Sequence, residues 1–163
     1  MSKEYCREIA DAINQYLIDE EWNFSFDEED GVFKFNVGSK TKAKQARYVI
    51  LVKNSSYTVY VYSPIGADAE DKDSLCRIAE FICRANYGLN LGNFELDMRD
   101  GEIRFKYSVD CDGGSVPNTE IIRNSILISG FMFDRYINGI LNIIFTDITA
   151  EEAVKQCEES ELL

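Results

Sequence analysis

The sequence predicts an α+β domain in which helices pack against an antiparallel β-sheet of five to six strands. Four segments alternate apolar and polar residues with the period of two that is typical of β-strands, and two further strand-like segments are apolar on both faces. These segments are grouped along the chain rather than alternating with helices, and a grouped order favours an antiparallel sheet. A length of 163 residues fits one domain, so we expect residues 1–163 to fold as a single unit.

A helix followed by a hairpin is predicted for the first part of the chain. Apolar residues recur at three- and four-residue spacing over 3–19, which is typical of an amphipathic helix. The period then changes to two, which predicts strands at 22–27 and 31–37 on either side of an acidic turn. We expect one face of this hairpin to pack against helices, and its members are Phe24, Phe26, Phe33 and Phe35.

The next two predicted strands, at 47–53 and 57–63, differ from the first pair because they are apolar on both faces. A strand with two apolar faces requires cover on both sides. We therefore expect a partner surface on the side of this pair that faces away from the core. That side carries Val49, Leu51, Tyr60 and Tyr62.

A helix and a second hairpin follow. Helical spacing over 71–87 ends at Gly88, a residue type common just beyond helix ends. Strands are predicted at 93–98 and 102–109, because both alternate and the Asp100-Gly101 pair between them is a strong turn signal. The apolar positions expected to face helices are Phe94, Leu96, Ile103 and Phe105.

A long helix is predicted from Pro117 to about Phe145. It carries apolar residues around much of its circumference, which indicates burial on more than one side. Gly130 or Gly139 is predicted to break or kink it. A short helix is predicted to open at Thr149, where the residues match a capping box. One sheet face cannot bury all of this apolar surface, so we add Phe133 to the expected partner-binding residues.

The residues that chemistry would need are missing from the sequence. There is no histidine, which excludes Ser-His-Asp and Cys-His catalysis and every histidine-containing metal site. No glycine-rich phosphate loop and no Cys-x-x-Cys pair occurs. We therefore expect no catalytic residue, no cofactor and no metal site.

The five cysteines are odd in number and widely spaced, which argues against a disulfide framework. We expect reduced thiols, with Cys76 and Cys83 buried as small apolar residues on one helix. Cys111 lies in a predicted loop and is the cysteine expected to be most exposed. The sequence therefore predicts neither an intramolecular disulfide nor a zinc site.

The net charge of −12 bears on the class of partner. An acidic surface repels phosphate backbones and anionic lipid surfaces, so we expect no nucleic acid and no membrane as partners. The only basic cluster spans Lys40 to Arg47 and is interpreted as a solvated loop or as a contact for an acidic partner or a phosphate. No secretory signal opens the chain, so we expect a cytoplasmic location.

Three runs carry a resemblance to a known family: FICRAN at 81–86, LGNFELD at 91–97 and DGEIRF at 100–105. In these residues the chain resembles the YbjN family of bacterial proteins, whose members are described as candidate regulators of sensory transduction. The resemblance implies a fold like that of type III secretion chaperones, which are small acidic proteins that hold extended client segments. It implies no catalytic residue. The matching positions are Asn86 as a helix-end cap, Gly92 and Gly101 as turn residues, and Phe94 as a core anchor.

The sequence therefore predicts a non-enzymatic protein-binding module with a chaperone-like or regulatory role. Self-association or a second protein would cover the expected partner surface. A small-molecule sensor is the alternative, followed by an enzyme. A compact cavity with converging polar groups would favour the sensor, and a long exposed apolar groove would favour the binding module. A further possibility is that the long helix covers the second sheet face, so that the expected partner residues are core.

Overall fold

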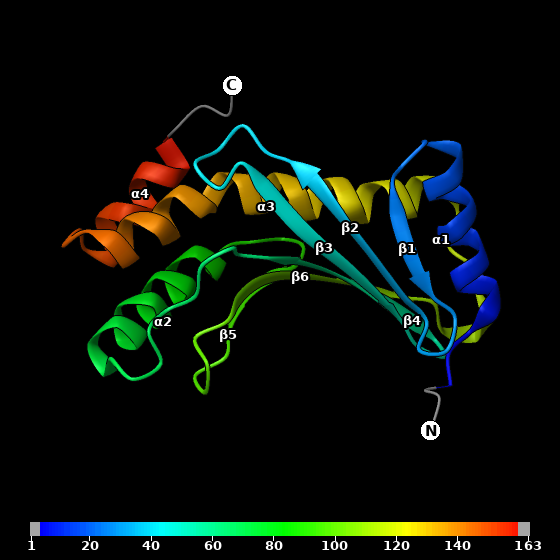
Figure 1. The fold of residues 1–163 in the computed structure, drawn as a ribbon, viewed down its shortest axis with the longest axis horizontal. Helices are drawn as coiled ribbons and strands as arrows, with labels where there is room; N and C mark the ends of the chain where they lie inside the picture. Colours follow the sequence, from blue (N-terminus) through cyan, green and yellow to red (C-terminus); the bar gives the residue numbers. More distant parts are fainter. Residues whose placement is uncertain (1–3, 160–163) are drawn as a thin grey trace.

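The computed structural model describes residues 4–159 and contains four α-helices and six strands within that range (Figure 1). The helices are α1 (Arg7–Asp19), α2 (Lys72–Asn86), α3 (Thr119–Phe145) and α4 (Ala150–Glu159), with a short 3-10 turn, η1, at Asp112–Gly114. The strands are β1 (Phe24–Asp27), β2 (Val32–Gly38), β3 (Gln45–Val52), β4 (Ser56–Tyr62), β5 (Asn93–Leu96) and β6 (Ile103–Asp110).

The six strands form one sheet in the order β1-β2-β3-β4-β6-β5, and every neighbouring pair is antiparallel. This confirms the predicted α+β class and the antiparallel sheet. Strand β5 ends two residues earlier than predicted because Asp97 already belongs to the turn, where its carbonyl accepts a hydrogen bond from the Gly101 N–H. Gly101 has a φ of +77°, the left-handed conformation that this turn requires.

One face of the sheet forms the core, and its residues are in register across five strands. The row that runs from β2 to β5 consists of Phe35, Tyr48, Val61, Phe105 and Phe94, each of which is buried. Rings of neighbouring strands touch along it, with centroid separations of 5.0 Å for Phe35–Tyr48 and for Phe94–Phe105. The period of two therefore predicted the core face correctly. Of the eight positions expected there, Phe24, Phe26 and Leu96 are only half-buried, because β1 and β5 are the edge strands.

Helix α3 lies along the core face and spans much of the length of the molecule (Figure 1). The Asn118 side chain caps its first turn by accepting from the Ile121 N–H. The buried Tyr57 hydroxyl of β4 reaches Ser125 of α3 at 3.0 Å. Small serine side chains on this stripe allow the helix to approach the strands closely.

The glycines of α3 do not interrupt it, contrary to the prediction of a break or kink. The helix is continuous from Thr119 to Phe145. A Cβ atom at Gly130 would collide with the Tyr48 hydroxyl, and one at Gly139 would come within 2.7 Å of the Phe81 ring. Both glycines therefore give neighbouring elements room to pack against α3.

Helices α2 and α4 pack on each other and on the C-terminal half of α3. That half of α3 is buried on several sides, as predicted, by α2, α4 and the sheet. Thr149 caps α4 as expected, since its hydroxyl accepts from the Glu152 N–H at 3.2 Å. No helix within residues 4–159 has the length and apolar character needed to cross a lipid bilayer.

The thiols lie in different places from those expected. Cys76 and Cys83 are exposed and Cys111 is buried, the reverse of the prediction. The buried stripe of α2 is formed by Leu75, Ile78, Phe81, Ile82 and Ala85, which turns both cysteines of that helix outward. Cys111 follows β6 directly and is anchored by its own N–H, which donates to the Ser55 carbonyl at 2.8 Å.

Candidate functional site

Clusters of titratable side chains are the first candidates for a functional site. Within residues 4–159, no group of three or more Cys, Asp or Glu side chains is arranged to hold a metal ion. Many of the carboxylates lie on turns and helix surfaces, where several interact with neighbouring N–H groups or single cations. The surfaces of the sheet and of α3 are therefore the candidates.

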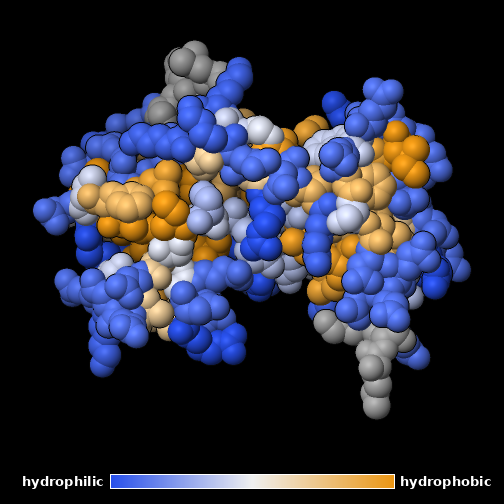
Figure 2. All heavy atoms as spheres, in the orientation of Figure 1, coloured by the Kyte–Doolittle hydropathy of each residue, from blue (hydrophilic) through white to orange (hydrophobic). Residues whose placement is uncertain are grey.

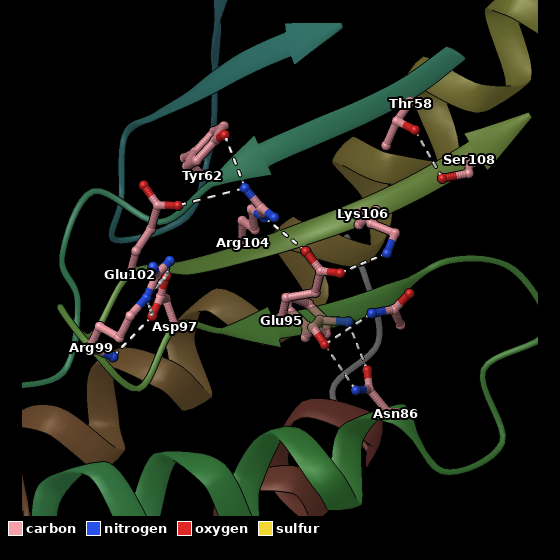
Figure 3. A network of polar contacts seen from close by, with 12 residues as sticks. Thr58, Tyr62, Asn86, Glu95, Asp97, Arg99, Glu102, Arg104, Lys106 and Ser108 are labelled. Carbon is pink, nitrogen blue, oxygen red and sulfur yellow. Dashed lines mark hydrogen bonds and ion pairs between the residues drawn. The ribbon is translucent and has the colours of Figure 1, made fainter. Parts of the chain in front are cut away.

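The sheet has a second face that no helix covers within the described residues, and we call it the open face. The contacts of α2 and α3 with β4, β5 and β6 lie on the core face, through Tyr57, Phe94 and Phe105. The alternating side chains of the same strands point the other way. Figure 3 shows Tyr62, Arg104 and Lys106 on the near side of β4 and β6, with α3 behind the strands.

Four of the five predicted partner-binding residues lie together on the open face. Val49 and Tyr60 are direct neighbours across β3 and β4, with Leu51 and Tyr62 one step further along each strand. All four are half-buried. Val32 of β2 pairs with Leu51 and extends the apolar area by one strand. The alternative in which the long helix covers this side within one chain does not hold, because α3 packs on the core face.

The fifth predicted residue, Phe133, does not belong to this surface. It is 0% exposed and lies in the core, on the opposite side of the sheet from the open face. The stripe of α3 that faces the core contains Ile126, Ser129, Phe133, Ile137 and Ile140, which follow three- and four-residue spacing. The exposed aromatic residues of this helix are Phe131 and, at its last position, Phe145, which keep 50% and 66% of their surface accessible.

Arginines stack on the tyrosines of the open face. The Arg47 guanidinium carbon lies 3.9 Å from the centroid of the Tyr62 ring, and that of Arg104 lies 4.3 Å from the centroid of the Tyr60 ring. We call these four residues the arginine–tyrosine cluster. Strand register produces it, since Tyr62 is the direct partner of Arg47 on β3 and of Arg104 on β6. A guanidinium held flat on a ring still directs N–H groups outward from its edge.

Glu95 pairs with both cations on the β6 side of the open face (Figure 3). Its carboxylate accepts from Arg104 Nε at 2.8 Å and from Lys106 Nζ at 2.7 Å. Burial alone would raise the pKa of the Glu95 carboxyl, but the hydrogen bonds and charges of Lys106 and Arg104 outweigh burial and hold the pKa below its usual value. Burial likewise opposes the charge of Arg104, yet Glu95 and Tyr62 raise its pKa. The Glu95 carboxylate and the Arg104 guanidinium therefore remain ionised at neutral pH.

The β2–β3 side of the open face is basic and contains no such pair. Lys34 and Arg47 are exposed there and take part in no ion pair within residues 4–159. The predicted basic loop joins these same two strands. Helix α3 holds the loop, since Ser39 donates to Asp134 at 2.8 Å and the Lys42 N–H donates to Asn138 at 3.3 Å. The lysines at 40, 42 and 44 are exposed.

A separate apolar groove lies between α3 and the loop that follows α2. It encloses about 720 Å³, and its lining consists of residues 88–91 with Leu127, Ile128, Phe131, Met132 and Arg135. Leu91, Leu127 and Phe131 are each about half exposed. Figure 2 shows hydrophobic side chains at the surface on both sides of the molecule, with hydrophilic ones between them. The excess of apolar residues in α3 predicts an uncovered apolar area. Its place beside residues 88–91 follows only from the structure.

Strand register also explains which site residues the sequence did not reveal. Lys34, Arg104 and Lys106 occupy the polar positions of predicted strands, and each looks like an ordinary solvated residue when its strand is considered alone. Only the pairing of β2, β3, β4 and β6 brings them around Val49 and Tyr60. The alternation of apolar and polar residues predicts the face of each residue correctly, but only the strand order shows which residues are neighbours across strands.

The fold is similar to a solved structure. No protein-family model and no curated protein matches the chain. The crystal structure of YbjN from E. coli, a protein proposed to be a transcription regulator, superimposes with a TM-score of 0.62. The match covers 85% of this chain and 94% of YbjN, at 11% sequence identity. The chain therefore has a YbjN-like α+β fold, as the residues at 81–105 had suggested.

Proposed function

We propose that this chain is a non-enzymatic protein-binding module, with a chaperone-like or regulatory role, and that it receives its partner on the open face. The observation that carries the proposal is the half-buried apolar centre of that face, formed by Val49, Leu51 and Tyr60, over which no described helix lies. Exposed apolar areas rimmed by polar residues mark interaction surfaces more often than they mark ordinary monomer surface.

The composition of the open face supports a protein partner. Tyrosine and arginine are enriched in protein–protein interfaces and at their energetic centres, and the arginine–tyrosine cluster supplies both. Burial of apolar surface contributes about 25 cal/mol per Å² before association entropy is subtracted. The rings are already ordered by Arg47 and Arg104, so binding would cost little additional side-chain entropy at these positions.

The similar structure supports a regulatory role within the same class. YbjN is proposed to be a transcription regulator, and we extend to this chain only the broader idea of regulation through a bound partner. The absence of histidine from the sequence argues in the same direction, because it removes the commonest acid–base group of enzymes. The odd number of scattered cysteines favours a reducing compartment, so we also propose a cytoplasmic location.

A small-molecule sensor is the second candidate, and the groove beside α3 is the feature that favours it. A specific ligand site needs several converging polar groups to orient the ligand. Among the side chains that line the groove, only Asn90 and Arg135 are polar. Arg135 Nε is buried without a hydrogen-bond partner in the described residues, although another nitrogen of the same guanidinium donates to the Glu158 carbonyl at 3.4 Å. One such group is a weaker basis for a function than the open face.

The proposal can be tested by photo-crosslinking in the native cell. We would place p-benzoylphenylalanine at Tyr60 and, as a matched control, at Tyr87, which is 90% exposed and lies outside the open face. The expected result is a discrete crosslinked protein from position 60 that is absent from position 87. The captured protein, or a second copy of this chain, should then bind the purified chain at least tenfold more weakly after Tyr60→Glu. Crosslinks from position 87 alone would contradict the proposal.

A further inference from the structure

We infer that the partner segment received by the open face is an extended polypeptide in which acidic residues alternate with apolar ones. This inference rests on the proposed function and adds the chemistry of the partner. It depends on the charge of the open face, on the cations there that lack a carboxylate, and on their spacing. All three follow from the register of β2, β3, β4 and β6.

The two central rows of the open face carry a charge opposite in sign to that of the whole chain. In its two central rows, four cations accompany one carboxylate, so the rows carry a net charge of +3 in a chain of net charge −12. The cations are Lys34, Arg47, Arg104 and Lys106, and the carboxylate is Glu95. Screening over about 8–10 Å at physiological salt means that a bound segment experiences these near charges more than the distant acidic surface.

Two of the four cations are available to a ligand. Glu95 engages both Arg104 and Lys106, whereas Lys34 and Arg47 have no carboxylate within ion-pair distance in residues 4–159. The Arg47 guanidinium lies over the Tyr62 ring, with its central carbon 3.9 Å from the ring centroid. A guanidinium can bind a carboxylate through two parallel hydrogen bonds that it donates.

The spacing of the cations indicates an extended ligand. Lys34, Val49, Tyr60 and Lys106 are successive neighbours on four adjacent strands. Strands lie about 4.8 Å apart, so the two lysine positions are about 14 Å from each other. Residues i and i+4 of an extended chain are separated by about the same distance and point to the same side. A segment that crosses the strands can therefore place an acidic residue at i over Lys34, which has no carboxylate partner within residues 4–159, and an apolar residue at i+2 over Val49 and Tyr60. Position i+4 then lies over Lys106, which already pairs with Glu95.

A single-stranded nucleic acid is less well matched to this surface, although interleaved aromatic and basic residues also occur in proteins that bind one. Base stacking needs free ring faces, and the guanidinium groups of Arg104 and Arg47 already lie over Tyr60 and Tyr62. The remaining central positions are aliphatic, such as Val49 and Leu51. A net charge of −12 also opposes a polyphosphate more strongly than a segment with a few carboxylates.

The test uses defined probes and the full chain. The acidic probe is a fluorescent peptide with Glu at every fourth position, Leu midway between them and Ser elsewhere. The matched probes carry Gln or Lys in place of Glu, and an oligothymidylate of similar length represents nucleic acid. Affinity is measured by fluorescence anisotropy at two salt concentrations, and the bound surface is mapped from amide chemical shifts.

We expect the Glu peptide to bind at least tenfold more tightly than the Gln peptide, and more weakly at high salt. Amide shifts should concentrate in β2, β3 and β4. Lys34→Glu and Arg47→Glu should each weaken binding by tenfold or more. Lys72→Glu, which makes the same charge change at the exposed start of α2, should change affinity less than twofold. Lys34→Glu should leave the fold intact, because within residues 4–159 the Lys34 side chain makes no hydrogen bond or ion pair. Weaker binding by this variant would therefore not be due to misfolding.

Three results would overturn the inference: equal binding of the Glu and Gln peptides, tighter binding of the oligothymidylate than of the Glu peptide, or no saturable binding of any probe. The first of these, with shifts on the open face, would leave the proposed function intact and remove only the charge preference. Failure of the proposed function would appear differently, as a Tyr60 position that crosslinks no protein in the cell.

Discussion

The guanidinium carbon of Arg47 lies 3.9 Å from the centroid of the Tyr62 ring, and the two residues are direct partners across β3 and β4. On the other side of Tyr62, Arg104 of β6 donates a hydrogen bond to the Tyr62 hydroxyl at 3.4 Å. One tyrosine thus contacts two arginines on a face that no helix covers within residues 4–159. This arrangement shields part of the apolar surface of the isolated chain while it keeps the charged groups oriented outward.

Removal of both members of the Arg47–Tyr62 pair should reveal a measurable coupling. We expect Arg47→Ala and Tyr62→Leu to be non-additive in the free energy of unfolding by about 0.5–1 kcal/mol, the usual size of an exposed cation–π contact. Urea denaturation of the wild type, both single variants and the double variant measures this term. The control cycle pairs Tyr62→Leu with Lys72→Ala, which has no contact with it, and should be additive. Equal values for the two cycles would mean that the stacking contributes nothing.

Phe131 and Phe133 of α3 should respond very differently to the same substitution. Phe133→Ala empties a fully buried position and should cost about 3–5 kcal/mol of unfolding free energy. Phe131→Ala removes a ring that is half exposed and should cost about 0.5 kcal/mol or less. Chemical denaturation of the two variants under the same conditions provides the comparison. A loss at Phe133 no larger than at Phe131 would show that the ring is not part of the core.

The contrast between these two residues also shows how far the sequence could be interpreted. In the strands, alternation assigned Phe33, Phe35 and Phe105 to the core without any knowledge of the partner strands, because a period of two leaves only two faces. In α3, apolar residues occur all round the helix, so their spacing does not show which side of the helix faces the core. Phe133 was therefore assigned to a partner surface, and only packing against the sheet shows that its side is the inner one.

The candidate site could be predicted from the sequence only in part. Val49, Leu51, Tyr60 and Tyr62 were assigned to one face from alternation alone, and the structure places them side by side. The cations around them were not predicted as a group. Lys34 and Lys106 are 72 positions apart in the numbering of the chain and belong to the same row only through the pairing of four strands. Such long-range neighbours depend on strand order, which local patterns do not encode.

Glu95 should stabilise the fold only above a threshold pH. Its pKa is lowered in the folded chain from an ordinary value near 4.5, so its contribution is present above the unfolded pKa and is lost as pH falls through the folded pKa. We expect Glu95→Gln to cost about 0.5–1 kcal/mol at pH 7, the size of a partly exposed ion pair. The difference from wild type should disappear in acid.

Urea denaturation of Glu95→Gln across the acid range measures this dependence. The matched control is Glu70→Gln, because Glu70 is exposed and forms no ion pair in the described residues. It should change the unfolding free energy by less than about 0.5 kcal/mol at pH 7. A Glu95→Gln effect that persists unchanged in acid would instead point to lost packing.

Buried tyrosines should make the fold sensitive to alkali. Burial, followed by the nearby charge of Glu158 and the hydrogen bond to it, raises the pKa of Tyr136 to about 12. Burial also raises the pKa of Tyr48 and Tyr57. A pKa raised by folding contributes stability that is complete below the unfolded value near 10 and is lost as pH rises through the folded value.

We therefore expect the free energy of unfolding to fall as pH increases from about 10 to about 12. Ultraviolet absorbance should show that a subset of the nine tyrosines ionises only with unfolding. Tyr136→Phe should flatten part of the pH dependence, whereas Tyr87→Phe, at a position that is 90% exposed, should leave it unchanged. Ionisation of every tyrosine before any loss of structure would be inconsistent with their burial.

Asn86 should be the residue that fastens the edge strand β5 to the end of α2. Its side chain carbonyl accepts from the Phe94 N–H at 2.7 Å, and its amide donates to the Phe94 carbonyl at 3.0 Å (Figure 3). The expected helix-end cap is thus a link between two elements. Removal of both bonds leaves backbone groups of a buried residue without this partner, which costs about 1–3 kcal/mol.

We expect Asn86→Ala to lower the free energy of unfolding by about that amount and to speed hydrogen exchange at the Phe94 amide. Asn86→Asp keeps the acceptor and loses the donor, so its effect should be intermediate. Asn90→Ala, at an exposed position in the following loop, is the control and should cost less than about 0.5 kcal/mol. Because β5 also carries Glu95, a loosened strand should weaken the pairs of Glu95 with Arg104 and Lys106. If Asn86→Ala and Asn90→Ala are indistinguishable in both measurements, β5 is held by its pairing with β6 alone.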